Sequence, residues 1–254
     1  MENENHILIE IKDIEAGYSG EIALSAVNLK IYENDFIGII GPNGGGKTTL
    51  VKVILGLIKP FKGEVINKLN GTNENKSIGY LPQINFIDKK FPISVKDVVL
   101  SGFMDKGKLI NKFTKEEKQT AMALMENMGI SHLKNKPIGE LSGGQLQRVF
   151  LSRAVVSSPK LLILDEPNTF VDNRFESELY EKLKELNKSM AILIISHDLG
   201  MISPYVKTIA CVNKKLHYHD SNVISEKQLK EYNCPIQLIT HGEVPHTVLG
   251  KHIH

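Results

Sequence analysis

The sequence has few of the features that mark membrane-spanning or disulfide-stapled proteins. Its 254 residues include no tryptophan and only two cysteines, Cys211 and Cys234. Two cysteines cannot make a disulfide framework, and they favour a reducing compartment. The longest apolar runs, residues 161–164 and 191–195, are far shorter than the roughly 20 residues that cross a bilayer. The polar start of the chain does not resemble a secretory signal. Any membrane-spanning part is therefore expected to be another chain.

An excess of charge of one sign is also missing. The formal net charge is +2, which is too small to indicate nucleic acid or an anionic membrane surface as a partner. The remaining composition is that of an ordinary globular protein, and a chain of this length can bury a substantial core. We therefore expect a globular protein that does not bind nucleic acid.

Two kinds of hydrophobic pattern predict two kinds of strand. Residues 7–14 and 24–31 alternate apolar and polar, which is typical of antiparallel strands with one wet face. Residues 36–40, 161–164 and 191–195 are continuous apolar runs, which are typical of strands covered on both faces. Helical patterns separate the apolar runs, so we expect an α/β fold with a parallel sheet and crossover helices.

The helical patterns divide the chain. A helix is predicted over residues 47–58, where Pro60 should stop it, and others over residues 114–128 and 176–186. Residues about 85–155 contain helical patterns with no strand run between them, so we interpret them as a helical lobe inserted into the α/β core.

A single domain is expected over residues 1–254, because no internal repeat, low-complexity tract or long linker interrupts the chain. Its core would comprise residues about 1–84 and 156–215. A C-terminal tail that contains several histidines, residues about 216–254, follows the core.

A glycine-rich segment follows the apolar run at 36–40 and matches the P-loop pattern G-x-x-x-x-G-K-[ST]. Glycines let backbone N–H groups approach phosphates closely, and a helix N-terminus adds unpaired donors and a partial positive charge. Lys47 would supply a point charge for the β- and γ-phosphates, and the Thr48 hydroxyl could ligate Mg²⁺. The candidate residues for binding ATP here are Gly41, Pro42, Asn43, Gly44, Gly45, Gly46, Lys47, Thr48 and Thr49.

Two carboxylates end the apolar run at 161–164. Because ligands of open α/β sheets bind at the carboxyl ends of the strands, these side chains are expected beside the P-loop. Asp165 would hold Mg²⁺, directly or through water. Glu166, one residue further on, is the candidate general base for the attacking water.

A third segment makes a family recognisable. Leu141, Ser142, Gly143, Gly144 and Gln145 are followed by Leu146, Gln147 and Arg148. The S-x-x-Q spacing of Ser142 and Gln145 predicts a capping box, and the two glycines bare a second helix N-terminus that can bind an anion. This string resembles the signature sequence of ATP-binding cassette (ABC) ATPases without departure. The resemblance implies the P-loop NTPase fold of that family, with a mixed sheet core, an N-terminal antiparallel β region and an inserted helical lobe.

The resemblance extends over most of the chain and implies further roles. Tyr18 resembles the aromatic residue that stacks on adenine. Gln83 resembles the glutamine that touches Mg²⁺ or the attacking water, and His197 the histidine that contacts the γ-phosphate. Asp172 resembles the aspartate through which two cassettes communicate, although residues 168–171 depart from the commoner small-residue version.

The resemblance also implies partners. ABC ATPases pair head to tail, so that each ATP lies between the P-loop of one subunit and the signature helix of the other. A second copy of this chain is the simplest partner, because the chain has both halves of the site. The resemblance further implies an integral-membrane permease, received in a groove that includes residues 91–95, and an extracytoplasmic solute-binding protein. The chain would then lie on the cytoplasmic face of the cell membrane as a peripheral subunit.

The cargo is suggested by a further resemblance, to cassettes of zinc and manganese importers. It rests on the short chain, on residues 211–213 and on the histidine-bearing end. The tail histidines are His217, His219, His241, His246, His252 and His254. His and Cys bind transition metals, but a polar, solvated tail is the simpler explanation of the same residues.

Three alternatives to a metal transporter subunit stay open. The first is a cassette for another small solute, such as a siderophore or a vitamin. The second is an ABC ATPase outside transport, although residues 83–141 leave no room for a long coiled coil and the chain has one signature sequence. The third is a P-loop kinase, which would have no use for a second phosphate-binding helix end.

Overall fold

The computed structural model describes residues 6–69, 78–83, 91–104, 112–167, 173–224, 236–240 and 245–249. Residues 173–176 and the last two ranges are described by their backbone alone. The chain divides into two compact units. Unit 1 comprises Met1–Leu69 and Tyr180–His254, and unit 2 comprises Asn70–Leu179. The boundaries expected from the sequence, near residues 84 and 155, stay a prediction.

An antiparallel sheet begins unit 1. It has the order β2-β1-β4 and is formed by β1 (Ile7–Tyr18), β2 (Glu21–Tyr32) and β4 (Lys62–Asn67). The alternation in the sequence is confirmed for residues 9–12 of β1, where Ile9 and Ile11 are buried while Glu10 is partly exposed and Lys12 is exposed; Leu8 is buried as well and departs from the alternation.

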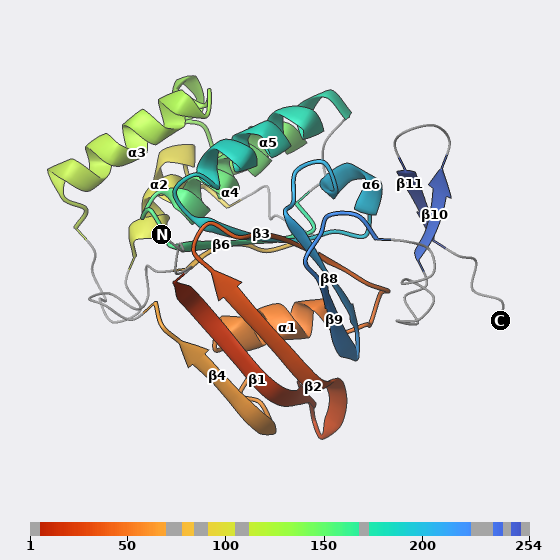
Figure 1. Ribbon diagram of the computed structural model, residues 1–254. Helices are drawn as coiled ribbons and strands as arrows, with labels where there is room; N and C mark the ends of the chain where they lie inside the picture. The colour runs from red at the N-terminus through yellow and green to blue at the C-terminus, as the bar shows by residue number, and fades with distance from the viewer. Residues whose placement is uncertain are drawn as a thin grey trace, which may run out of the picture. The chain divides into compact units, whose positions relative to one another are not determined.

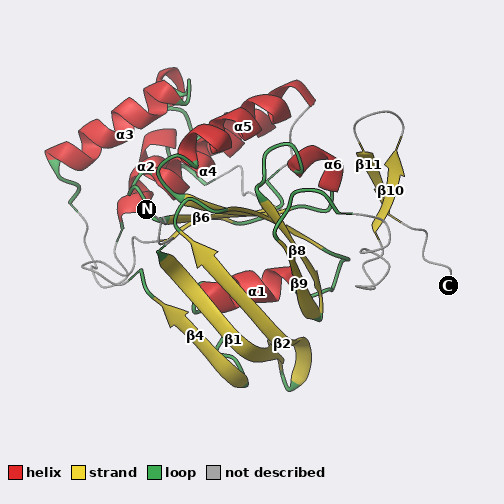
Figure 2. Cartoon of the chain, in the orientation of Figure 1, coloured by secondary structure: helices red, strands yellow, loops and turns green. Residues whose placement is uncertain are grey.

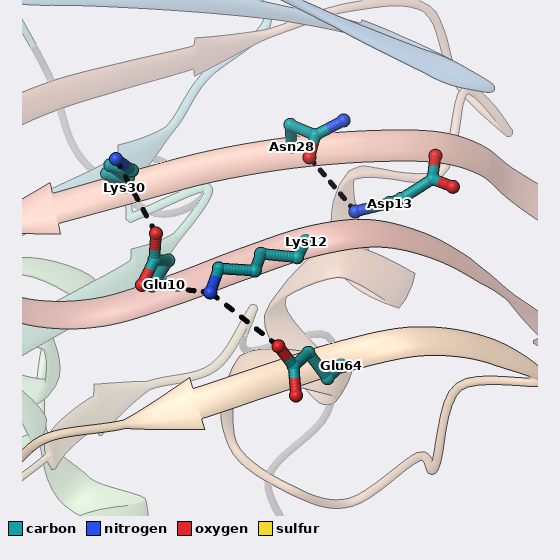
Figure 3. A network of polar contacts seen from close by, with 6 residues as sticks. All are labelled: Glu10, Lys12, Asp13, Asn28, Lys30 and Glu64. Atoms are coloured by element: carbon teal, nitrogen blue, oxygen red, sulfur yellow. Dashed lines mark hydrogen bonds and ion pairs between the residues drawn. The ribbon is translucent and has the colours of Figure 1, made fainter.

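Cross-strand ion pairs occupy the wet face of this sheet (Figure 3). Glu10 lies opposite Lys30, with 3.5 Å between their charged atoms, and Lys12 lies opposite Glu64 at 3.6 Å. Asp13 adds a backbone N–H that donates to Asn28 Oδ1 at 3.0 Å. Because the lysines of these pairs are 48% and 51% exposed, each pair contributes about 0–1 kcal/mol, and the buried face holds the sheet together.

A second sheet in unit 1 has both parallel and antiparallel strands. The central strand β3 (Phe36–Ile40) pairs in parallel with β7 (Ala191–Ile195) and with β8 (Thr208–Asn213). β9 (Lys215–His219) pairs antiparallel with β8. All residues of β3 and β7 are buried, which confirms the prediction from their continuous apolar runs and gives the mixed sheet that the family resemblance implies.

Helices and a hairpin complete unit 1. Helix α1 (Lys47–Ile54) follows β3 and contacts β1 and β2 (Figure 1). The short helix α6 (Leu199–Ile202) follows β7. A hairpin near the C-terminus is formed by β10 (Ile236–Thr240) and β11 (Pro245–Leu249).

Helix α1 ends earlier than the sequence pattern predicts. The expected helix over residues 47–58 stops at Ile54, and Gly56 adopts a φ of 68°. The Leu57 N–H donates to the Lys52 carbonyl at 2.8 Å, and the Gly56 N–H donates to the Val53 carbonyl at 3.0 Å. This pair of bonds is a Schellman motif. Leu57 consequently lies outside the helix, 61% exposed, and does not belong to the buried helical face.

Unit 2 combines a parallel strand pair with helices, which are drawn in red in Figure 2. Strand β5 (Ile78–Leu81) pairs in parallel with β6 (Leu161–Asp165). The helices between them are α2 (Val95–Leu100), α3 (Lys115–Asn127) and α4 (Gly143–Val155), joined by 3₁₀ turns at Ser101–Phe103, Ser131–Leu133 and Ile138–Glu140. Helix α5 (Asn173–Leu186) begins in unit 2 and ends in unit 1. The helix expected over residues 114–128 is confirmed as α3, with Thr114 as its N-cap and Met128 as its C-cap.

Two remaining expectations concern the membrane and the cysteines. Within the described ranges, no helix is both long enough and apolar enough to cross a bilayer.

Cys211, on β8, is fully buried and disulfide-bonded, which differs from the reduced state that the cysteine count favoured. A count of cysteines gives no information about which of them the fold brings together. Cys234 lies outside the described residues.

Candidate functional site

The glycine-rich loop lies between β3 and α1 in unit 1, as the P-loop pattern predicts. Gly46 is the N-cap of α1, with a φ of 104°, and no side chain caps this helix end. The first backbone N–H groups of α1 are therefore not used by a side-chain cap, which leaves them for a ligand. Gly44 also has a positive φ, 75°, and nothing would touch a Cβ there within 4 Å. Glycine is needed at Gly44 for the backbone conformation alone.

Strand β8 and the turn after it hold the loop from one side. A Cβ on Gly41 would lie 2.0 Å from the Val212 carbonyl oxygen, and one on Gly45 would lie 2.7 Å from the same oxygen. The Lys214 N–H donates to the Gly45 carbonyl at 2.9 Å. These contacts require glycine at both loop positions, because any side chain would collide with backbone atoms.

Lys47 turns its ammonium group back over the loop. Its Nζ donates to the carbonyl oxygens of Gly41, at 2.8 Å, and Pro42, at 2.9 Å, and the residue is 6% exposed. The adjacent Thr48 is exposed, whereas Thr49 is buried, 5% exposed. A buried ammonium, glycines that admit a close approach and an uncapped helix end fit a triphosphate.

Two further predicted residues belong to unit 1. Tyr18, 47% exposed, ends β1, and the Nζ of Lys52 on α1 lies 5.3 Å from its ring centroid. The Tyr18 ring thus lies beside the helix that begins at the P-loop. His197 is exposed two residues beyond Ile195 of β7. Ile195 is paired with Ile39 of β3, and Gly41 lies two residues beyond Ile39. His197 and the P-loop therefore follow the ends of two parallel strands at the same edge of one sheet.

The carboxylates end β6 in unit 2. Asp165 is 4% exposed on a fully buried strand. Burial and, to a smaller degree, the charge of Asp165 raise the pKa of Tyr80 on β5 to about 12. Glu166 follows with a φ of 48°, in the left-handed region that is unfavourable for a residue with a side chain.

Gln83 and Glu166 meet in the structure. Gln83 follows β5, and its Nε2 donates to Glu166 Oε2 at 2.6 Å. The two residues are 83 positions apart in the sequence, and they come together because β5 and β6 are paired strands that run in the same direction. A hydrogen bond to an ionised carboxylate is short and strong, so the Gln83 amide orients the carboxylate of the candidate base.

The signature segment begins helix α4 in the predicted manner. Ser142 is the N-cap; its Oγ accepts from the Gln145 N–H at 3.3 Å, while Gln145 Oε1 accepts from the Ser142 N–H at 3.1 Å. This reciprocal pair confirms the capping box. Because the Ser142 oxygen serves as an acceptor, its hydroxyl proton can point outward from the exposed residue toward an anion.

One contact at the site has no counterpart in the sequence prediction. Gln147 lies on α4, 4% exposed, and its Nε2 donates to the carbonyl oxygen of Pro167, the residue after Glu166. A glutamine on the buried side of a helix is a weak signal by itself, and only the fold reveals its partner 20 residues away.

Some predicted residues lie outside the described ranges, namely Asp172, His241, His252 and His254; His246 is described by its backbone alone. His217 and His219 lie on β9, where burial lowers the pKa of both imidazoles. Within the part of the chain that the structure describes, no group of three or more His, Cys, Asp or Glu residues could hold a metal ion.

A P-loop between a buried parallel strand and a helix, with a carboxylate pair ending another buried strand, defines a P-loop nucleotide-binding protein. The family model described as "ABC transporter" matches residues 24–169, which is more than half of the chain. The chain belongs to the ABC transporter family. Its fold and its family make it the ATP-binding and ATP-hydrolysing subunit of such a transporter.

Three curated relatives match this chain over most of their own length. One from Thermotoga maritima, "Probable metal transport system ATP-binding protein", is 35% identical over 94% of this chain and 97% of the relative. The "Zinc uptake system ATP-binding protein ZurA" of Listeria innocua is 36% identical over 89% and 96%. The "Zinc import ATP-binding protein ZnuC" of Pasteurella multocida is 37% identical over 82% and 74%.

Solved structures support the same fold. A nucleotide-free ATP-binding cassette from an ABC transporter has a TM-score of 0.74 and 25% identity, and the match covers 89% of this chain and 94% of that one. The structure of cbiO1 from Clostridium perfringens, part of the ABC transporter complex cbiONQ, has a TM-score of 0.73 and 28% identity over 90% and 94%.

Proposed function

We propose that Glu166 is the general base of ATP hydrolysis and that Gln83 and His197 assist it. The observation that supports this most directly is the 2.6 Å hydrogen bond from Gln83 Nε2 to Glu166 Oε2. A carboxylate whose direction is fixed by an amide can hold an attacking water in one orientation. His197, exposed beyond β7, would contact the γ-phosphate.

ATP and Mg²⁺ would be held by the residues that the sequence singles out. The loop from Gly41 to Thr49 would bind the phosphates through its N–H groups and the Lys47 ammonium, and Tyr18 would stack on the adenine. Thr48, Gln83 and Asp165 would be ligands of Mg²⁺, directly or through water. The metal ion, when bound, neutralises charge that develops on the phosphate oxygens.

A second cassette would complete each nucleotide site. Ser142, Gly143, Gly144 and Gln145 begin a helix whose end is ready to bind an anion, and the P-loop of the same chain already accounts for one nucleotide. We therefore propose a head-to-tail homodimer in which the signature helix of each subunit contacts the γ-phosphate held by the other. Because ATP binds the closed pair better than the open one, binding and hydrolysis close and open the pair.

The proposed cargo is a divalent metal ion, zinc or manganese, that enters through a separate integral-membrane permease. The names of the relatives, which refer to zinc uptake, zinc import and metal transport, support this cargo. An extracytoplasmic solute-binding protein would deliver the ion, and the chain would lie on the cytoplasmic face of the membrane. A cassette for another small solute, such as a siderophore, is the alternative that the cargo experiment below separates.

The catalytic proposal is tested with Glu166→Gln. The variant should lose ATP turnover by at least about 100-fold, since a general base contributes typically 10²–10⁴-fold, and it should accumulate as an ATP-bound dimer in size-exclusion chromatography with Mg²⁺ and ATP. Glu185→Gln is the matched control, because Glu185 is an exposed residue that pairs with Lys182 on α5. A Glu166→Gln variant that stays monomeric and turns over ATP at the wild-type rate would show that Glu166 is not the base.

The cargo is tested in cells of the source organism that lack the chain. Zinc and manganese contents are measured by mass spectrometry in chelator-treated medium, with wild type or Lys47→Ala supplied from a plasmid. Wild type should restore one of the two metals and Lys47→Ala should restore neither. Unchanged contents of both metals in all strains would contradict a zinc or manganese cargo and leave the ATPase assignment intact.

A further inference from the structure

Gln147 connects the signature helix to the backbone that follows the candidate base. It lies two residues after Gln145 on α4, and its Nε2 donates to the Pro167 carbonyl oxygen. Proline has no backbone N–H, so this carbonyl is the only backbone hydrogen-bonding group that Pro167 has. The side chain of Gln147 is therefore bonded to the one backbone group through which Pro167 can be held.

The backbone at Glu166 needs such support. Its φ of 48° is unfavourable for a residue with a Cβ, and a proline follows it, which restricts the preceding residue further. Strained conformations of this kind persist only where the surroundings impose them. Gln83 holds the end of the Glu166 side chain, and Gln147 holds the carbonyl of the next residue, Pro167, one peptide beyond Glu166.

The side-chain amide of Gln147 is only partly hydrogen-bonded, so it adds little to the free energy of unfolding. Among the described residues no donor reaches its Oε1, although this atom is buried. A buried acceptor without a donor is destabilising, and a leucine of similar size would remove that acceptor but would take the donor from the buried Pro167 carbonyl. The stability gained and lost on such a substitution should nearly balance, so the value of the amide at this position lies in where it holds Pro167.

From these contacts we propose that Gln147 is a positioning residue, which fixes the backbone of the base Glu166 from the helix that begins with the signature segment. This inference rests on the proposed function, because it assumes that Glu166 is the base. In the proposed pair, the signature segment contacts the partner's nucleotide while Glu166 acts on the chain's own. Gln147 therefore joins the two nucleotide sites of the pair through one side chain.

The test compares Gln147→Leu with Ser152→Ala, a buried position on the same helix whose hydroxyl donates only to the Arg148 carbonyl within that helix. Gln147→Leu should lower the kcat of ATP hydrolysis by about 10- to 100-fold, since a misplacement of about 1 Å costs on the order of 10²-fold. Its dissociation constant for ATP should stay within about twofold of wild type, and its thermal midpoint within about 3 °C. Ser152→Ala should match wild type in kcat.

Two measurements separate positioning from a general loss of structure. Gln147→Leu should accumulate the ATP-bound dimer as Glu166→Gln does, because a slowly hydrolysing pair stays closed. Added to Glu166→Gln, it should cause no further loss of residual turnover, because both changes act through one group.

The outcomes distinguish this inference from the proposed function. Wild-type kcat in Gln147→Leu, beside a Glu166→Gln variant that has lost turnover, would overturn the role of Gln147 and leave the base assignment standing. Loss of ATP binding or of the folded state in Gln147→Leu would likewise overturn it, since the residue would then be structural. Wild-type turnover in Glu166→Gln would overturn both.

Discussion

Replacing Gly41 with alanine tests whether β8 shapes the P-loop. The added Cβ would lie 2.0 Å from the Val212 carbonyl oxygen, where ordinary contact begins at 3.4 Å, and Gly41 has a φ of 149°. A conformation unfavourable to side chains costs about 1–2 kcal/mol, and overpacking against backbone adds about 1–3 kcal/mol. We therefore expect Gly41→Ala to lower the free energy of unfolding by about 2–5 kcal/mol.

The same displacement should weaken ATP binding. The Gly41 carbonyl accepts from Lys47 Nζ, so moving the loop by more than an ångström moves the ammonium group too. Losing one hydrogen bond to a charged group costs about 1.5–3 kcal/mol, and we expect the ATP dissociation constant to rise about 10- to 100-fold.

Gly56→Ala is the matched control for Gly41→Ala. Gly56 ends the same helix with a φ of 68°, and nothing would touch its Cβ within 4 Å, so only the conformational cost of about 1–2 kcal/mol remains. Urea unfolding and isothermal titration calorimetry measure the two quantities. If Gly41→Ala binds ATP as tightly as wild type and has the same free energy of unfolding as Gly56→Ala, the contact with Val212 does not shape the loop.

Further predictions concern the second helix end, the adenine and the pH. Ser142→Ala and Thr114→Ala each remove the N-cap of a capping box and should each lower the free energy of unfolding by about 1 kcal/mol. Only Ser142→Ala should lower ATP turnover. Equal turnover in the two variants would argue against a phosphate contact at Ser142. Tyr18→Ala should raise the ATP dissociation constant about 2- to 12-fold, as expected for a lost stacking contact of about 0.5–1.5 kcal/mol, and Tyr18→Phe should not; calorimetry that finds the alanine variant unchanged would remove Tyr18 from the adenine site. Burial lowers the pKa of His217 and His219, so the folded state favours the neutral rings. The contribution of these rings to the free energy of unfolding should therefore be fully present above the ordinary pKa of 6.5 and should be lost as the pH drops below it. Urea unfolding at pH 7.5 and 5.5 should then show a smaller loss for a double glutamine variant, and an equal loss would contradict this account.

Features set by local sequence were predictable from the chain alone. The buried strands β3 and β7 were predicted with the bounds that the structure has, because continuous apolar runs reflect burial on both faces. The capping box at Ser142 was predictable for a similar reason, since its two members are three residues apart and need no tertiary contact.

Features set by distant contacts were not predictable. Periodicity carried helix α1 through Leu57, although Gly56 stops it, because an apolar residue after a glycine still matches the helical pattern. The bond from Gln147 to Pro167 depends on how α4 packs beside the end of β6, which no local pattern encodes. The candidate role of Gln83 came from the family resemblance and that of Glu166 from its position after an apolar strand, and their hydrogen bond became visible only in the fold.

The contacts of Val212 and Lys214 with the P-loop have a consequence for synthesis of the chain. The loop at residues 41–46 leaves the ribosome early, but Val212 and Lys214, which close it, are made about 170 residues later. At 5–20 residues per second, that delay lasts roughly ten to thirty seconds. The sheet formed by β1, β2 and β4 can assemble during this interval, because all of its strands lie within the first 67 residues. A nascent chain would therefore present a folded β sheet well before it can retain ATP, and the capacity to bind nucleotide would be among the last properties that synthesis confers.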